Sequence, residues 1–238
     1  MRLAQQLGQV LEYGIGNGRI ALPAARAGAH VTGLDLSRPM LADLRSRLAL
    51  EAPEVRARVT ARAGDMRRVR LGRRFPLVTC PFNAALHLYE RVDVEAWLAR
   101  VREHLAPGGK LVFDVSMPEP ADLSRKPTRA YHAPPFVHPS LGRVKYREYF
   151  DYDRVRQILF VSMCFEPVEG RNRPGGSEVM TPLAHRQFFP RELEALLHYN
   201  GFETLEVHGD FEGGALTQTS DVMVWHARPY RRASRGGP

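Results

Sequence analysis

Short apolar runs alternate along this chain with longer segments whose apolar residues recur at helical spacing. The runs are typical of buried parallel strands and lie at Gln9–Tyr13, His30–Leu34, Val59–Ala63, Leu77–Cys80 and Lys110–Val115. The clearest helical stripe consists of Val94, Trp97, Leu98, Val101 and Leu105. Alternation of strands and helices predicts an α/β protein built on a parallel sheet.

The pattern changes after the fifth strand. Prolines argue against a regular element between positions 118 and 139, so we expect a loop or lid there. Alternating or apolar segments then predict antiparallel strands at Arg143–Tyr152, Arg154–Glu166 and Thr181–Phe189, with a turn over Glu169–Glu178. A helix that begins at Pro190 and two strands, Glu203–His208 and Asp221–Ala227, complete the sheet. The fold class is therefore a doubly wound α/β sheet of about seven strands with a small antiparallel β insertion after strand five.

A glycine-rich turn follows the first strand. Gly14, Gly16 and Gly18 are spaced G-x-G-x-G, and Arg19 stands where a dinucleotide-binding turn has its third glycine. Glu12 before the turn would repel a pyrophosphate but suits an ammonium group, and Asp35 at the tip of the second strand can accept the hydroxyls of a ribose. S-adenosylmethionine has an ammonium group and a ribose diol and lacks a phosphate, so it is the predicted cofactor.

Four segments resemble the class I S-adenosylmethionine-dependent methyltransferases, most closely those that act on small molecules such as amino sugars and small amines. They are Leu11–Arg19, Thr32–Leu41, Ala63–Arg67 and Leu105–Leu111. The resemblance implies a Rossmann-like sheet of order 3-2-1-4-5-7-6 whose last strand is antiparallel. It also implies a set of cofactor-binding residues, in which Asp65 accepts a hydrogen bond from the adenine amino group: Glu12, Gly14, Ile15, Gly16, Asp35, Leu36, Met40, Asp65, Met66 and Pro81.

We expect three parts in the chain. Residues 1–117 and 189–228 form the cofactor-binding methyltransferase core, residues 118–188 form the lid and insertion, and residues 229–238 form a basic, disordered tail. Family members usually have a helical segment before strand one, whereas only Met1–Gly8 precede it here. We therefore expect a late annotated start, a truncated chain or a partner that supplies this cover.

The expected reaction is methyl transfer to a nitrogen or oxygen of a small polar molecule. An acceptor that must lose a proton needs a base, and the candidates are His87, after strand four, and His185, in the insertion. A lone histidine is otherwise a hydrogen-bonded structural residue. The candidate acceptor contacts are Asn83, Tyr131, His132 and Arg186. Aromatic residues of the insertion form mainly a small core, and a minority of them could line an acceptor pocket.

Composition limits the partners. The net charge of +8 comes almost entirely from arginine, and we interpret it as composition bias and a solvated face rather than a nucleic-acid surface. Apolar runs are too short to span a bilayer, the start lacks the apolar region of a signal peptide, and two cysteines provide neither a disulfide framework nor a zinc site. We expect a cytoplasmic protein without a metal, and a homodimer formed through the layered insertion stays open.

Three alternatives remain. The charge favours a nucleic-acid methyltransferase, but the Asn/Asp-Pro-Pro-Tyr/Phe motif of amino-group methylation is absent from Cys80-Pro81-Phe82-Asn83. An NAD-dependent oxidoreductase is disfavoured by Arg19. A non-catalytic module that retained the cofactor fold would bind the cofactor without transferring a methyl group.

Overall fold

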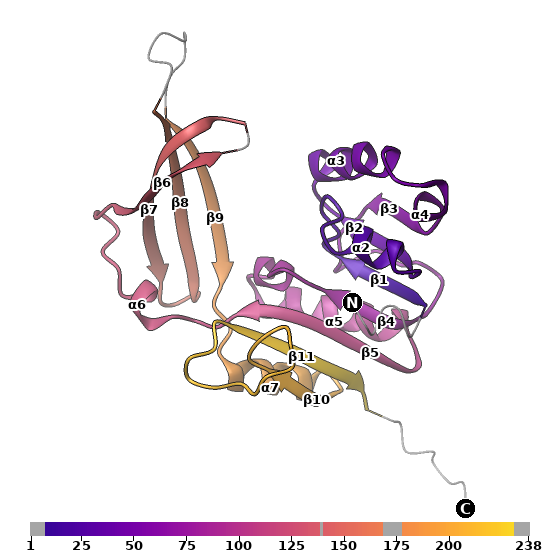
Figure 1. The fold of residues 1–238 in the computed structure, drawn as a ribbon. Coiled ribbons are helices and arrows are strands. Elements are labelled where there is room, and N and C mark those ends of the chain that lie inside the picture. The colour runs from indigo at the N-terminus through magenta and orange to yellow at the C-terminus, as the bar shows by residue number, and fades with distance from the viewer. Residues whose placement is uncertain (1–7, 139, 169–177, 231–238) are drawn as a thin grey trace, which may run out of the picture. The chain divides into compact units, whose positions relative to one another are not determined.

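The computed structural model describes residues 8–138, 140–168 and 178–230. The chain divides into two compact units, one formed by Met1–Met117 with Phe189–Pro238 and the other by Pro118–Phe188 (Figure 1). Each unit has its own sheet. We describe them separately.

A seven-stranded sheet forms the centre of the first unit, in the order β10-β11-β5-β4-β1-β2-β3. Its strands are β1 (Gln9–Tyr13), β2 (His30–Asp35), β3 (Val59–Ala63), β4 (Phe75–Cys80), β5 (Leu105–Ser116), β10 (Phe202–His208) and β11 (Val222–Pro229). β1 pairs in parallel with both β2 and β4, whereas β11 is antiparallel to β5 and to β10. The predicted sheet, with its strand order and its antiparallel last strand, is confirmed.

Helices connect these strands. They are α2 (Ala21–Arg26), α3 (Arg38–Ala49), α4 (Pro53–Ala57), the 3₁₀ helix η1 (Ala84–His87), α5 (Arg91–His104) and α7 (Pro190–Tyr199). α3 begins where its sequence indicates, because the Ser37 side chain accepts a hydrogen bond from the Met40 amide and Pro39 lies in the first turn. α5 buries four residues of the predicted apolar stripe, Val94, Trp97, Leu98 and Val101, whereas the fifth, Leu105, is buried at the start of β5. The short helix α4 was not expected from the sequence.

Aromatic side chains join the sheet to α5. Phe113 on β5 is fully buried, and its ring meets Trp97 of α5 edge-on at a centroid distance of 5.5 Å. The Trp225 ring on β11 is stacked 6.3 Å from Phe113. Such aromatic pairs each contribute about 0.5–1.5 kcal/mol beyond the area they bury. They hold β5 and β11 in place, so the carboxyl ends of the central strands have a rigid base.

The second unit is a four-stranded antiparallel sheet in the order β6-β7-β8-β9, with one short helix. The strands are β6 (Tyr131–His138), β7 (Gly142–Asp153), β8 (Ile158–Pro167) and β9 (Val179–Arg186), and the helix is α6 (Pro120–Leu123). The predicted antiparallel insertion after strand five is thus confirmed. The predicted turn over Glu169–Glu178 lies mostly outside the described residues, as does most of the predicted tail.

The prediction of a loop from position 118 to 139 is wrong, because α6 and β6 lie within it. Pro120 occupies the first position of α6, where a missing N–H costs nothing. Pro134 and Pro135 fall at an irregularity in β6, between the pairs Ala133–Tyr146 and Phe136–Val144. β6 is an edge strand, and edge strands with bulges tolerate proline.

Predicted strand boundaries also move: β5 begins at Leu105 rather than at Lys110, and β9 ends at Arg186 rather than at Phe189. The strand expected to start at Arg154 begins at Ile158 instead. The Asp153 carboxylate accepts hydrogen bonds from the amides of Val155 (2.9 Å) and Arg156 (3.0 Å), and Gln157 has a φ of 52°. This side-chain contact to the backbone stabilises a turn in place of the first residues of the strand.

Candidate functional site

A cavity of about 610 Å³ lies at the carboxyl ends of β1, β2, β3 and β4, within the first unit. Its volume falls in the range of small-molecule sites. The sequence-predicted residues that line it are Glu12, Gly14, Ile15, Gly16, Asp35, Leu36, Met40, Met66, Pro81 and His87. Sequence reasoning missed several others, among them Arg19, Phe82 and Ala84. The cavity lies where doubly wound sheets bind their ligands.

The glycine turn brings backbone to the cavity wall. The amides of Gly14 and Ile15 donate to the Leu34 carbonyl at 2.8 and 3.1 Å, which ties the turn to the end of β2. Gly14 has a φ of 70°, and a Cβ on it would lie 2.7 Å from the Ala84 Cβ. Only glycine therefore fits at this position, and the turn packs directly against the segment after β4.

Asp35 is held by two backbone amides. The Gly16 amide donates to Oδ2 at 2.7 Å, and the Ser37 amide donates to Oδ1 at 2.7 Å. A carboxylate offers about four acceptor positions, so each oxygen can still accept a hydroxyl from a ligand. The arrangement presents a fixed negative group to the cavity.

Glu12 contributes a second carboxyl group. It is 2% exposed, and its carboxyl group forms no hydrogen bond or ion pair within the described ranges. Burial raises its pKa to about 8, and the negative charge of Asp35 adds to the effect. A cation that entered the cavity would stabilise the ionised form of Glu12.

The segment after β4 has an unusual backbone. Phe82 and Asn83 have φ values of 58° and 61°, both in the left-handed region. The Asn83 side chain turns to β5, where its Oδ1 accepts a hydrogen bond from the Ser116 amide at 2.7 Å and its Nδ2 donates to Ser116 Oγ at 2.9 Å. Asn83, expected to contact the acceptor, does not line the cavity, whereas its neighbour Phe82 does.

Asp65 also lies off the cavity wall, although its neighbours Gly64 and Met66 line it. Arg67 donates to both carboxylate oxygens, from Nε to Oδ1 at 3.0 Å and from Nη2 to Oδ2 at 2.7 Å. These bonds lower the pKa of Asp65, and Arg67 also contacts Asp93. Asp65 is thus an ion-paired residue, and the adenine contact expected for it stays a prediction.

His87 lies on η1 and lines the cavity. Its pKa is lowered because the surrounding protein partly desolvates the ring, while Asp35 acts in the opposite direction. The other candidate base, His185, lies on β9 in the second unit.

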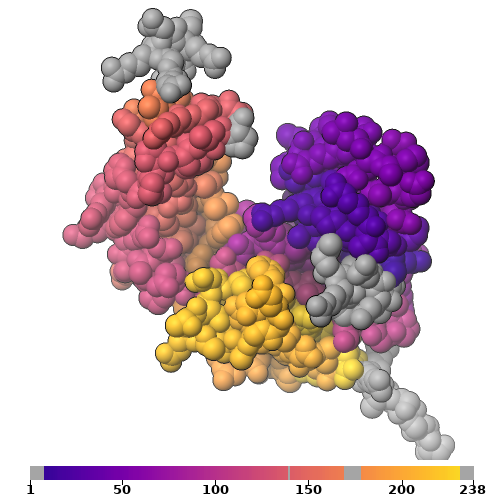
Figure 2. Space-filling view, viewed as in Figure 1, coloured from indigo at the N-terminus to yellow at the C-terminus, as the bar shows by residue number. Residues whose placement is uncertain are grey.

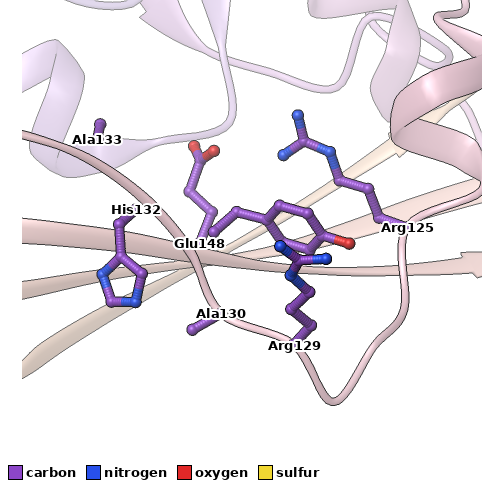
Figure 3. Close-up of a pocket in the computed structure, with 7 residues that line it drawn as sticks. Arg125, Arg129, Ala130, His132, Ala133 and Glu148 are labelled. Carbon is purple, nitrogen blue, oxygen red and sulfur yellow. The ribbon is translucent and has the colours of Figure 1, made fainter.

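A second cavity, of about 420 Å³, lies within the insertion (Figure 3). Tyr131 and His132 line it together with Arg125, Arg129 and Glu148. The Arg125 guanidinium lies 4.4 Å from the centroid of the Tyr131 ring and 4.1 Å from that of Phe150, and it forms an ion pair with Asp122. Arg186 does not line this cavity, and its guanidinium covers the Phe188 ring at 4.8 Å.

Metal clusters and membrane-spanning helices are both absent from the described residues. The described part of the chain contains no cluster of three or more His, Cys, Asp or Glu side chains that could hold a metal ion. It also contains no helix of the length and apolar character needed to cross a membrane.

The fold and the cavity define a doubly wound α/β protein with a cavity of small-molecule size at its glycine turn. Residues 10–109 match the family model described as a methyltransferase domain. The match covers less than half of the chain, and over this segment the chain resembles the class I S-adenosylmethionine-dependent methyltransferases, as the sequence predicted. S-adenosylmethionine is the methyl donor of this family, as the sequence predicted.

Individual relatives are consistent with this assignment. The chain is 34% identical over 113 residues to a dTDP-3-amino-3,6-dideoxy-α-D-glucopyranose N,N-dimethyltransferase of Streptomyces fradiae, covering 48% of this chain and 41% of that relative. It is similar to the CcbJ methyltransferase of Streptomyces caelestis (TM-score 0.81, 26% identity, 97% of this chain and 86% of that one). A third is the S-adenosylmethionine-bound amino pentose methyltransferase CalS10 of Micromonospora echinaspora (TM-score 0.68, 25% identity, 94% and 86%).

Proposed function

We propose that this protein transfers a methyl group from S-adenosylmethionine to a nitrogen of a small polar acceptor. The observation that carries the proposal is the cavity at the glycine turn, where Glu12 and Asp35 place two carboxyl groups. Asp35 suits the hydroxyls of a ribose, and Glu12, whose ionised form a bound cation stabilises, suits a cationic amino-acid end. The relative named for an amino-sugar acceptor is aligned over less than half of its length, so the acceptor class itself is part of the proposal.

Each wall of the cavity has a role in this proposal. Glu12 binds the ammonium group, Asp35 binds the ribose hydroxyls, and the backbone of Gly14 and Gly16 follows the methionine part. The apolar residues contact the remaining carbon skeleton and the adenine: Ile15, Leu36, Met40, Met66 and Pro81. Asp65 orients the Gly64–Met66 segment through its bonds to Arg67.

His87 is the proposed general base. An amine acceptor is protonated in water and must lose a proton before it attacks the methyl carbon. The lowered pKa of His87 keeps the ring neutral near pH 7, so it can accept that proton. We expect His87→Ala to lower kcat about 10²–10⁴-fold. Full turnover in this variant and in His185→Ala would remove the base from the mechanism and leave methyl transfer standing.

Calorimetric titration tests the cofactor directly. We expect S-adenosylhomocysteine to bind and NAD not to bind. Incubation with methyl-labelled S-adenosylmethionine and dTDP-3-amino-3,6-dideoxy-α-D-glucopyranose then tests the acceptor class, with the 3-hydroxy sugar as the matched control. Binding of NAD without binding of S-adenosylhomocysteine would contradict the proposal.

The partner is a small molecule rather than a nucleic acid in this proposal. Duplex binding that persists at physiological salt would contradict this part, because weak phosphate contacts are lost as salt rises. The acceptor contacts expected at Tyr131, His132 and Arg186 remain predictions. A homodimer remains a prediction too, and light scattering of the purified chain measures it.

A further inference from the structure

The backbone after β4 adopts a conformation that its side chains disfavour. A φ of 58° is unfavourable for phenylalanine, because its Cβ crowds the backbone in the left-handed region. Asn83, with a φ of 61°, tolerates this region better. Strained residues of this kind persist only where surrounding bonds impose them, and they concentrate at functional sites.

Asp114 on β5 imposes this turn. It is 7% exposed, and its Oδ1 accepts the Phe82 amide at 2.9 Å while its Oδ2 accepts the Asn83 amide at 3.3 Å. These are charge-assisted hydrogen bonds to two consecutive amides. The bonds between Asn83 and Ser116 fix the same turn from its other side.

The turn places the Phe82 ring at the cavity, where one face of the ring contacts a cationic side chain. The side chain is 65% exposed although it lines the cavity, so the strain does not serve to bury it. The Arg19 guanidinium lies over the ring, 4.4 Å from its centroid. Arg19 forms no ion pair with any described residue, so the aromatic face is where this cation rests.

We propose that the Phe82 ring receives the sulfonium group of the methyl donor, that Arg19 yields this place on binding, and that Asp114 is the positioning residue for the ring. The inference rests on the proposed function. The donor carries a positive sulfonium, whereas the product S-adenosylhomocysteine carries a neutral thioether. The ring therefore favours donor over product, because only the donor gains the attraction between a cation and the aromatic face.

Binding of the two ligands measures this preference without any acceptor. Phe82→Leu keeps the apolar bulk and the backbone strain. We expect it to lower the affinity for S-adenosylmethionine about fivefold and the affinity for S-adenosylhomocysteine less than about twofold. Phe82→Tyr restores the ring and retains the donor preference. The matched control is Phe211→Leu, an exposed phenylalanine of the same unit that does not line the cavity. Equal changes in both affinities would overturn the inference and leave the proposed function standing.

Hydrogen exchange tests Asp114 separately from any ligand. Asp114→Ala speeds exchange of the Phe82 amide about tenfold or more, since the carboxylate no longer holds it, and Asp114→Asn gives partial protection because one acceptor remains. Both variants shift the donor-to-product affinity ratio in the direction of Phe82→Leu. Unchanged exchange in a folded Asp114→Ala variant overturns the positioning role.

A third variant covers the case in which Asp114→Ala does not fold. Phe82→Gly removes the strain and the ring together, so we expect a higher Tm than in Phe211→Gly with the donor preference lost. A Tm as low as that of Phe211→Gly would show that Phe82 is not strained. If the unaltered protein binds neither ligand, both the proposed function and the proposed role of the Phe82 ring fail. The exchange and Tm measurements still decide whether Asp114 positions the turn.

Discussion

The two cavities of this protein differ in the residues that line them and in the sign of the charged groups among those residues. The cavity at the glycine turn is lined by residues of that turn and of the strand ends, and its carboxyl groups come from Glu12 and Asp35. The insertion cavity is built from long side chains, with guanidinium groups from Arg125 and Arg129 and one carboxylate from Glu148. Figure 2 shows the two units that contain them as differently coloured parts of the chain.

This difference teaches which site is pre-organised. Backbone held by a sheet loses little freedom when a ligand binds, whereas long side chains must first be ordered. Asp35 is fixed by two short hydrogen bonds, whereas the Arg129 guanidinium makes only a distant ring contact within the described residues, 5.4 Å from the centroid of Tyr131. The first cavity therefore has the features of a specific cofactor site, and the second has a more adaptable surface.

The largest expected effect follows from removing the fixed carboxylate. Asp35→Ala should lower the affinity for S-adenosylhomocysteine about 10- to 100-fold, because charge-assisted hydrogen bonds of about 1.5–3 kcal/mol are lost. Titration calorimetry measures the change. Asp43→Ala is the control, since Asp43 is an exposed aspartate of α3 outside the cavity. Equal losses in both variants would mean that the cavity does not define the cofactor site.

Glu12 predicts a pH dependence of stability. Its folded pKa is raised to about 8, so the folded protein holds a proton that the unfolded chain releases at lower pH. Stability therefore falls as pH rises from the ordinary glutamate pKa to about 8, and then levels off. Glu12→Gln removes this loss. The Tm of the variant relative to that of the unaltered protein should therefore rise as the pH increases from about 5 to about 8.

Thermal melts over this pH range measure the gain. The control is Glu54→Gln, at an exposed glutamate of α4. A constant Tm difference across the range would show that Glu12 ionises at its ordinary pKa in the folded protein.

The smallest effects belong to the insertion cavity. Arg125→Ala removes contacts with two aromatic rings and the ion pair with Asp122, so we expect a loss of about 0.5–2 kcal/mol in stability. Arg129→Ala, the matched variant with only the more distant ring contact, should change stability by less than about 0.5 kcal/mol. Chemical denaturation measures both. Neither variant should alter the affinity for S-adenosylhomocysteine, and a change would show that the two regions do not act separately.

The sequence predicted the parts of the cavity whose roles follow from strand ends and glycines. Gly14 and Asp35 were predicted because a turn glycine and a residue at a strand tip have their positions set by local backbone geometry. The same reasoning predicted the parallel sheet. The family resemblance added the strand order, which local patterns do not contain.

The missed features depend on contacts between distant segments. The segment Cys80-Pro81-Phe82-Asn83 does not predict a left-handed backbone conformation at Phe82. The turn is imposed by Asp114, which is 32 positions away from Phe82. In the sequence, Asp114 is only a polar residue within a predicted buried strand, which does not indicate its contact with the turn. Asp65 shows the opposite case, since its family position was recognised while its ion pair with Arg67 was not.

The prolines of the insertion have a consequence for how copies of this chain meet. Pro134 and Pro135 lie in β6 and Pro182 lies in β9, which are the two outer strands of the four-stranded sheet. A proline has no N–H to offer, so both margins are poor templates for a foreign strand. The sheet resists growth into an intermolecular ladder, the first step toward aggregation. Two copies that associate through this insertion would therefore meet through its faces, where side chains rather than backbone set the specificity.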